Sequence, residues 1–483
     1  MYIGIDLGTS GVKSILMSRD GIIIGTKTVA MSVSRPKPLW SEQDPKDWWE
    51  ATCQTIEALK NEFDLSDVKA IGLSGQMHGA TLLDSDGEVI RPAILWNDGR
   101  CEEECRELEQ KVPDSRLITG NIMMPGFTAP KLKWVANYEP EKFKRIDKVL
   151  LPKDYLRFKM TGDFASDMSD SAGTCWLDVK ARDWSDALLH ATGLARKNMP
   201  KLYEGSDVTG VLTQKVAKQW GMPCVPVVAG GGDNAAGAVG VGLTEPGQAM
   251  LSLGTSGVYF AVSDGFISNP ESALHSFCHA VPNTWHTMSV ILSAASCLQW
   301  VAKLTGFDDV GEMIASVDEH ADEDSQVVFL PYLSGERTPH NDPNAKGVFF
   351  GMTHSTTRNE LALAVMEGVG FAFADGFDAL HVTKVVPEEI SLIGGGARSE
   401  YWRQMLADIV EKPLEYRKGG DVGPALGAAR LAILGTEEAV SLKDICPVPE
   451  LVQRHEPNKD RQNYYQTKRA VYRNLYIKLK DLF

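Results

Sequence analysis

The six residues LGTSGV occur twice in the chain, beginning at Leu7 and again at Leu253. Alternating apolar runs flank each copy, so each is expected to form a short turn between two strands. The glycines allow close approach of the backbone to a ligand, and exposed N–H groups with Thr and Ser hydroxyls suit phosphate oxygens. Two such turns facing each other across a cleft would hold a polyphosphate from both sides. The residues expected to contact phosphate are Gly8, Thr9, Ser10, Gly254 and Thr255.

An acidic residue precedes only the first copy, where Asp6 stands; Ser252 occupies the matching position in the second. A triphosphate site needs a divalent cation, and Mg²⁺ is usually held through waters and one or two carboxylates. A second carboxylate directly against the phosphates would repel them. We therefore interpret Asp6 as the acid that serves the metal, with an ordinary turn residue as the alternative. Lys13 reaches phosphate or is a solvated strand lysine; the sequence leaves both open.

The elements that must position these turns follow from the apolar patterns around them. In the first half, three alternating runs broken by glycine predict antiparallel strands, and a helix should begin at Pro45 with Asp44 as its N-cap. A buried strand, residues 68–75, comes next. The second half repeats this order. The strands expected there are residues 248–257, 258–263, 285–293 and 389–396, and the helices are residues 294–306, 358–380 and 397–411.

Six identical residues at the same place in two similar layouts indicate duplication rather than chance. A length of 483 residues allows two to four domains. We predict an α/β protein with one domain at residues 1–244 and another at residues 245–483. A helix-like tail from about residue 465 is expected to pack back on the first domain.

Composition excludes several classes of function. A net charge of −15 argues against a nucleic-acid or anionic-membrane surface, which would need a basic stripe. No apolar run approaches the length of a membrane span, and the chain opens on a strand rather than on a signal peptide. The eight cysteines include no CxxC pattern and are expected to be reduced structural thiols. We therefore expect a cytoplasmic protein.

Paired phosphate hairpins in two similar halves resemble the sugar kinase/Hsp70/actin superfamily. Within it, Gly126–Trp134 and Gly347–Glu367 are similar to the two signatures of the FGGY carbohydrate kinases, and the resemblance covers essentially the whole chain. It implies two ribonuclease-H-like domains flanking an interdomain cleft, ATP and Mg²⁺ as cofactors, a small sugar as substrate and a homodimer. Lys131 and Glu367, within these signatures, are not assigned to catalysis.

Asp233 follows a buried strand and a glycine run and opens a helix of small residues. Its ordinary interpretation is a helix N-cap, although a carboxylate at such a switch also points into a cleft. The resemblance implies that Asp233 is the base that accepts the hydroxyl proton, and we place it with Asp6 near the metal. An ordinary aspartate pKa near 3.9 makes a weak base, which suffices if proton transfer comes late.

The sugar site is expected around Met77 and His78, after another buried strand. A lone histidine is more often an ordinary hydrogen-bonding residue. The Gln-Met-His-Gly form, however, is similar to that of family members that phosphorylate a ketopentose, in which the Met backbone and the His side chain contact the sugar. Trp96 and Arg100 offer a flat apolar surface and hydrogen-bond donors suited to a polyol, or else belong to a Trp-anchored turn.

Three consecutive glycines, Gly394, Gly395 and Gly396, resemble the adenosine motif of the family. They would let the backbone lie against adenine and ribose. A Rossmann dinucleotide site fits poorly because the run lacks the GxGxxG spacing. The small-residue segment that follows at residues 419–430 packs beside this motif or belongs to the core.

The function that the resemblance implies is transfer of the γ-phosphoryl group of MgATP to the 5-hydroxyl of D-xylulose. A kinase for another ketopentose or a polyol, such as ribulose, is the alternative within the family. An ATP-binding sugar sensor without catalysis is the alternative from another class, and Asp233 beside the sugar segment argues against it.

Overall fold

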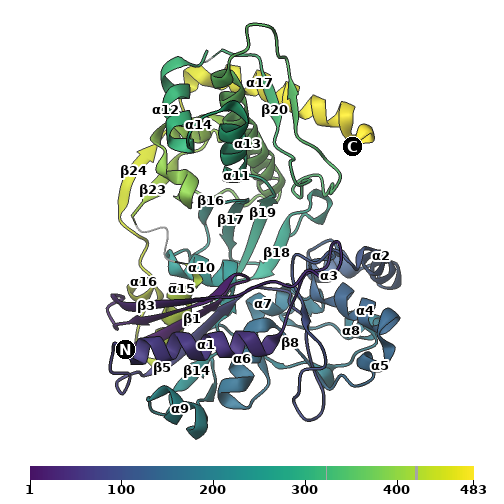
Figure 1. Ribbon diagram of the computed structural model, residues 1–483, viewed down its shortest axis with the longest axis vertical. Helices are drawn as coiled ribbons and strands as arrows, with labels where there is room; N and C mark the ends of the chain where they lie inside the picture. Colours follow the sequence, from purple (N-terminus) through teal and green to yellow (C-terminus); the bar gives the residue numbers. More distant parts are fainter. Residues whose placement is uncertain (323, 419–422) are drawn as a thin grey trace.

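Two mixed sheets of seven strands lie at the centres of the two halves in the computed structural model, which describes residues 1–322, 324–418 and 423–483 (Figure 1). In spatial order the first sheet contains β13 (Val208–Val211), β14 (Pro226–Val228), β5 (Ala70–Gly75), β1 (Tyr2–Leu7), β2 (Gly11–Met17) and β3 (Ile23–Ala30), with β15 (Gly231–Gly232) also paired to β5. The second contains β18 (His275–Cys278), β19 (Trp285–Ile291), β17 (Gly257–Ser263), β16 (Gln248–Leu253), β22 (Glu389–Ile393), β23 (Leu414–Arg417) and β24 (Leu451–His455).

The predicted opening of the chain is confirmed. Strands β1, β2 and β3 are antiparallel, and the register places Asp6 opposite Lys13. Helix α1 (Pro45–Lys60) begins at the predicted proline, and the Asp44 carboxylate accepts a hydrogen bond of 2.9 Å from the Lys46 backbone N–H. Strand β5 then runs parallel to β1. Its end, just before Met77 and His78 of the expected sugar site, therefore lies beside the first hairpin.

The second half repeats this order, as predicted. Strands β16, β17 and β19 are antiparallel, and β22 is parallel to β16. The helices of this half, among the described residues, are α11 (Ala295–Thr305), α12 (Val310–His320), α13 (Arg358–His381), α14 (Glu400–Val410), α15 (Pro424–Thr436), α16 (Leu442–Ile445) and α17 (Lys459–Leu479). The edge strand β18 was not predicted, because all four of its residues are buried and so show no alternation.

Smaller elements fill the first half between β5 and the end of its sheet. The helices are α2 (Glu102–Lys111), α3 (Ser115–Thr119), α4 (Thr128–Tyr138), α5 (Pro140–Phe143), α6 (Pro152–Thr161), α7 (Met168–Ala172), α8 (Asp186–Thr192) and α9 (Gln214–Trp220). Two-stranded pairs are β4 (Glu42–Gln43) with β7 (Ala93–Ile94), β6 (Thr81–Leu83) with β8 (Lys148–Leu150), β9 (Ala165–Asp167) with β12 (Lys201–Tyr203), β10 (Leu177–Asp178) with β11 (Asp183–Trp184) and, in the second half, β20 (Val328–Leu330) with β21 (Val348–Phe350). The 3-10 turns are η1 (Arg196–Asn198), η2 (Pro270–Ser272), η3 (Gly395–Arg398) and η4 (Lys480–Leu482).

One helix of the second half lies on the sheet of the first. Helix α15 (Pro424–Thr436) packs on β1 and β5 and against α10 (Asp233–Gly240), as the lower part of Figure 1 shows. A side chain at Gly4 or Gly72 would come within 1.9 or 1.8 Å of backbone oxygens of α15, so glycine is required on both strands. This segment, predicted to lie beside the adenosine motif or in the core, is therefore core packing over residues 424–436; residues 419–422 lie outside the described part of the chain.

The tail corrects one prediction, since it packs on the second domain rather than the first. Helix α17 lies along α14, α13 and β20, at the end of the molecule remote from β1 (Figure 1). Lys468 on this helix forms a buried ion pair with Glu367 of α13, and the hydroxyls of Tyr472 and Tyr332 lie 2.8 Å apart. The tail carries an apolar stripe at helical spacing that packs on the core of the second domain, but such a stripe does not show which surface it covers. Among the described residues, no helix is long and apolar enough to cross a membrane.

Candidate active site between the two domains

The first hairpin is closed by a hydrogen bond of 3.0 Å from the Gly8 N–H to the Gly11 carbonyl, which leaves Ser10 exposed at its tip. The Thr9 hydroxyl accepts a bond of 2.9 Å from the Trp96 indole N–H. It also donates, over 2.9 Å, to the Gln76 side-chain carbonyl. The hydroxyl of Thr9 is thus already used within the first domain, and the exposed Ser10 at the tip stays the candidate phosphate contact of this hairpin.

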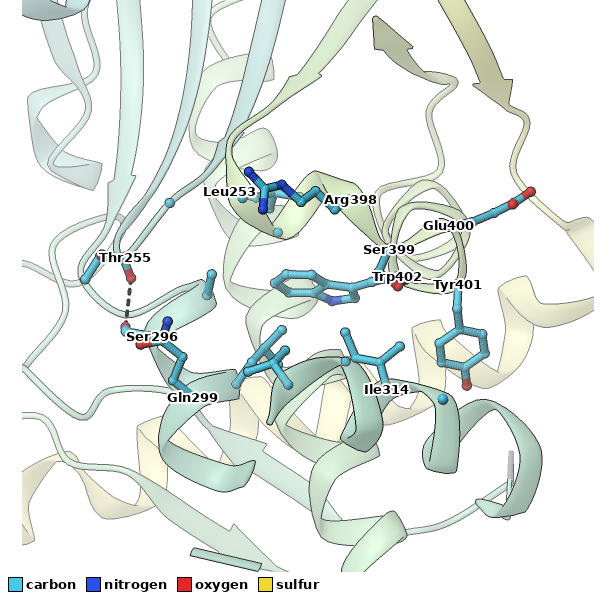
Figure 2. Close-up of a pocket in the computed structure, with 18 of the residues that line it drawn as sticks. Leu253, Thr255, Ser296, Gln299, Ile314, Arg398, Ser399, Glu400, Tyr401 and Trp402 are labelled. Carbon is cyan, nitrogen blue, oxygen red and sulfur yellow. Dashed lines mark hydrogen bonds between the residues drawn. The ribbon is translucent and has the colours of Figure 1, made fainter. Parts of the chain in front are cut away.

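The second hairpin is fastened to the start of α11. The backbone N–H groups of Ala294 and Ala295 donate to the carbonyls of Thr255 and Gly254, each over 2.9 Å. The Ser296 hydroxyl donates to the Thr255 carbonyl over 2.7 Å (Figure 2). With its carbonyls occupied in this way, the turn keeps the exposed Thr255 side chain free for a ligand.

A cavity of about 880 Å³ opens beside the second hairpin and brings Gly254 and Thr255 together with Gly395 and Gly396, as predicted. A Cβ built on Gly395 meets no atom within 4 Å, so its backbone borders open space. Gly394 instead has a φ of +90° and packs against Leu253, with its Cβ position 2.8 Å from the Leu253 carbonyl oxygen. Its role is to turn the chain, and the neighbouring glycines line the cavity.

The sequence did not indicate the remaining walls of this cavity. They come from α11, α12, η3 and α14, and Figure 2 shows the Trp402 indole between Arg398 and the helices opposite. The lining residues that were missed include Ser296, Gln299, Ile314, Ser399, Tyr401 and Trp402. In the sequence these positions belong to ordinary amphipathic helices, with no motif to separate a cavity wall from a core face.

A second cavity, of about 270 Å³, contains four of the predicted residues: Met77, His78, Trp96 and Asp233. Its other walls were not predicted. They include Phe127 and Asn234 from the first half of the chain and Ser256, His275, Phe277 and Arg337 from the second half. Both domains therefore contribute to this cavity.

His78 is held in one orientation. Its backbone has a φ of +69°, its ring Nδ1 donates to the Gly173 carbonyl over 2.6 Å, and the ring lies edge-on to Phe127 with centroids 4.9 Å apart. The Lys131 amine donates to the His78 carbonyl over 2.9 Å, which gives this signature residue a structural role. Burial lowers the pKa of His78 to about 3, so the ring is neutral and Nε2 is left as an acceptor.

The two candidate acids lie close enough for their charges to interact. Burial, followed by the charge of Asp6, raises the pKa of Asp233 to about 7. Burial also raises the pKa of Asp6 to about 6, against the opposing effect of Lys13. An aspartate of pKa about 7 is a better base near neutrality than the ordinary aspartate that the sequence suggested. One oxygen of Asp233 accepts hydrogen bonds of 2.8 and 3.0 Å from the backbone and side chain of Asn234.

A buried polar network supports the turn that carries Asp233. The N–H of Gly232 donates to the Ser169 hydroxyl over 3.1 Å, and that hydroxyl donates to Asp167. Asp167 is paired with Lys153 at 2.8 Å, and both side chains are fully buried. Because each group in this chain has a partner, the strand-to-helix turn before Asp233 is fixed in position.

Arg100 corrects a prediction, because it does not line the sugar cavity. Its guanidinium pairs with Asp98 at 2.6 Å and with Glu42 at 2.8 Å, lies 3.6 Å from the Trp40 ring centroid, and is 1% exposed. The sequence showed a donor beside Trp96 but not the distant Glu42 that engages it. Arg100 therefore holds the loop that carries Trp96 and does not meet a ligand.

The second hairpin separates the two cavities. Thr255 lines the larger one, and the next residue, Ser256, lines the smaller one, where Asp233 also lies. A phosphate held by this turn would face a group bound beside Asp233. This arrangement suits transfer of a phosphoryl group from a nucleotide in the larger cavity to a hydroxyl in the smaller one.

Comparisons with known proteins agree with this geometry. The model of the FGGY family of carbohydrate kinases matches through its N-terminal domain at residues 1–240 and its C-terminal domain at residues 249–436. The chain is 64% identical over 483 residues to the xylulose kinase of Escherichia coli K12 and 60% identical over 482 residues to that of Klebsiella pneumoniae, with 100% of each chain covered. A solved structure from Brucella ovis, described as a xyloylose kinase, is 47% identical and covers 100% of both chains with a TM-score of 0.95.

These likenesses confirm the predicted fold of two α/β domains of the actin/Hsp70/sugar kinase type. The predicted boundary at residue 244 stays a prediction. The family model matches most of the chain, and the similarity to known kinases extends over its full length. The duplicated hairpins and the cavity shared between the domains agree with these matches. The chain belongs to the FGGY family of carbohydrate kinases.

Proposed function

We propose that this kinase transfers the γ-phosphoryl group of ATP to the 5-hydroxyl of D-xylulose, yielding D-xylulose 5-phosphate and ADP. The observation that carries the proposal is the second hairpin, whose adjacent residues Thr255 and Ser256 line the nucleotide-sized and the sugar-sized cavity. The choice of sugar is supported by the curated relatives named xylulose kinase, which match over their full length.

In this proposal the nucleotide occupies the larger cavity. The adenosine lies against the backbone of Gly395 and Gly396, and the phosphates extend toward Thr255 and the turn at Gly8–Ser10. Gly395 borders open space, so a planar ring can approach its backbone without displacing a side chain. Lys13 stands opposite Asp6 in the strand register, close to where the phosphates would lie.

The residues present also fit Mg²⁺. Asp6 has a buried carboxylate oxygen, Oδ1, without a hydrogen-bond partner among the described residues, and carboxylate oxygen is a ligand that Mg²⁺ prefers. Asp6 would hold the ion, with Asp233 nearby, and the bound ion would neutralise charge on the phosphates. Burial raises the pKa of both acids, and the charge of Asp6 adds to the effect at Asp233, so a cation bound beside them would favour their ionised forms.

The sugar occupies the smaller cavity in this proposal. Asp233 accepts the proton of the attacking hydroxyl, and His78 accepts a hydrogen bond from another hydroxyl through Nε2. Because walls from both domains contact the sugar, its binding would draw the domains together and exclude water from the phosphates. The homodimer and the cytoplasmic location expected from the sequence stay predictions.

The test is an ADP-release assay with MgATP and a panel of acceptors: D-xylulose, L-xylulose, D-ribulose, L-ribulose, glycerol and no sugar. We expect turnover with D-xylulose to exceed that with each other acceptor. Strong turnover with a different sugar would keep the kinase and reject D-xylulose as its substrate. ATP binding without any sugar-dependent ADP release would favour a sensor instead.

A further inference from the structure

Arg337 brings a positive charge to the sugar cavity from the second domain. It lies on the loop between β20 and β21, and its side chain is half-buried in the wall beside His78 and His275. No sequence motif indicated it, and the roles assigned above to the phosphate hairpins, Asp6 and Asp233 do not use it.

The loop is fixed to the second sheet on both sides of Arg337. Before it, the Glu336 carboxylate accepts a hydrogen bond of 2.9 Å from the Leu292 N–H. After it, Thr338 and Val290 exchange two bonds of 3.0 Å, one through the Thr338 hydroxyl and one through its N–H. Arg337 is thus carried into the cavity by an anchored backbone, as a binding group requires.

The contacts of the guanidinium leave donors for a ligand. Its Nη1 donates to Nε2 of His275 over 3.4 Å. His275 is fixed as the matching acceptor because its Nδ1 donates to the Asn121 side-chain carbonyl over 3.0 Å. Among the described residues, no carboxylate forms an ion pair with Arg337, although Asp233 lines the same cavity. Arg337 and Asp233 are therefore placed to contact different parts of one ligand.

The chemistry of the sugar that accepts the phosphoryl group indicates which of its groups Arg337 would contact. A 2-ketopentose whose 5-hydroxyl is free to react cannot have closed its furanose ring, because ring closure consumes that hydroxyl. It is therefore bound as the open chain, with a free carbonyl at C2. A carbonyl oxygen only accepts hydrogen bonds, so the cavity needs a donor for it.

The other polar side chains of the cavity are poor candidates for that donor. The indole N–H of Trp96 is bonded to Thr9. One amide N–H of Asn234 donates to Asp233, which holds this amide at the end of the cavity where the reacting hydroxyl would lie. His78 presents an acceptor, because its ring proton is bonded to Gly173. Ser256 belongs to the hairpin expected to hold phosphate. A guanidinium with unused N–H groups remains.

We propose that Arg337 donates a hydrogen bond to the C2 carbonyl oxygen of the open-chain ketopentose and so makes the enzyme prefer a ketose to the corresponding pentitol, an inference that rests on the function proposed above. A pentitol has a hydroxyl at C2 in place of the carbonyl. Arg337 can donate a hydrogen bond to the oxygen of that hydroxyl but cannot accept one, so the hydroxyl proton is left without an acceptor in a buried site.

The test compares kcat/KM for D-xylulose with kcat/KM for xylitol in the wild type, Arg337→Met and Arg337→Gln. We expect Arg337→Met to lower kcat/KM for D-xylulose by about 10- to 100-fold, the effect of losing a hydrogen bond from a charged donor. Its effect on xylitol should be smaller, so that the preference for the ketose falls at least about tenfold. Arg337→Gln offers both a donor and an acceptor and should narrow the preference as well. KM for ATP should not change.

Arg145→Met is the matched control, since Arg145 is an exposed arginine of the first domain that pairs with Asp84 on the surface. Equal losses for both acceptors, or a wild type without preference for the ketose, would overturn the proposal. If Arg337→Met does not fold by circular dichroism, Arg337→Gln decides the matter by the same ratio. A wild type that releases no ADP with either acceptor would instead refute the proposed function.

Discussion

Replacing Asp233 with asparagine should strongly reduce kinase turnover and at the same time stabilise the free protein. The substitution is close to isosteric, and the new side-chain oxygen can still accept the bonds from Asn234. Loss of a general base lowers kcat by about 10²- to 10⁴-fold. The stability change follows from the pKa of Asp233, which rises from an ordinary 3.8 to about 7 in the folded protein.

Whether ionisation of Asp233 raises or lowers the free energy of unfolding depends on whether the folded or the unfolded protein binds the carboxyl proton more tightly. Because the folded protein holds it more tightly, ionising Asp233 weakens folding progressively from pH 3.8 to about pH 7, and the full penalty remains above pH 7. At about 1.36 kcal/mol per pH unit the upper limit is about 4 kcal/mol. Since Asp233 is only half-buried, we expect about 2 kcal/mol. Asparagine carries no such penalty.

The assay is thermal unfolding of the wild type and Asp233→Asn without ligands, at pH 4.5 and pH 8. The variant should melt higher at pH 8 by a few degrees and nearly equal to the wild type at pH 4.5. Asp6→Asn serves as a companion: its gain should be smaller, and the double variant should gain less than the sum, because the charge of Asp6 contributes to the pKa of Asp233. A gain that is equal at both pH values, or a loss at pH 8, would refute the reasoning.

Three further outcomes are expected. Gly395→Val should raise KM for ATP at least about tenfold with little change in melting temperature, because its Cβ meets no atom within 4 Å and the side chain enters the larger cavity; an unchanged KM would place the nucleotide elsewhere. Arg100→Met should destabilise the protein by about 3–5 kcal/mol in urea unfolding, because it leaves the carboxylate of Asp98 buried without its cation, whereas Glu42 keeps its pairing with Arg91; a loss of sugar affinity alone, with stability intact, would contradict the structural role. In the free enzyme kcat/KM should rise with pH and level off above about pH 7 as Asp233 loses its proton, and a flat profile from pH 5.5 to 8 would argue against Asp233 as the base.

The parts of the fold that the sequence predicted are those determined by neighbouring residues. Both hairpins, the helix start at Pro45 and the strand order of each half follow from short-range patterns and a repeated motif, and the structure confirms them. The position of Asp233 beside a cavity was likewise recognisable, because a glycine run between a strand and a helix is a local signal, and its role as the base stays a prediction.

What the sequence could not predict depends on contacts between distant segments. Arg100 looked like a sugar contact because its partner Glu42 comes from another part of the first domain. Arg337 and His275 carry no motif, and only the packing of β18 and the β20–β21 loop brings them to the sugar cavity. The tail was placed on the wrong domain because the apolar stripe of a helix shows that one face is covered but not which segment covers it. Here α13, α14 and β20 cover it, and Lys468 of the tail pairs with Glu367 of α13.

The position of α15 has a consequence for how this protein is made. The faces of β1 and β5 against which it packs are synthesised at the very start of the chain, whereas α15 comes at Pro424–Thr436. During synthesis on the ribosome, one apolar face of the first sheet therefore stays exposed until α15, near the end of the second half, has been made. A truncated chain that ends near residue 244 would have the same exposed face permanently, and we expect it to aggregate rather than yield an independent sugar-binding domain.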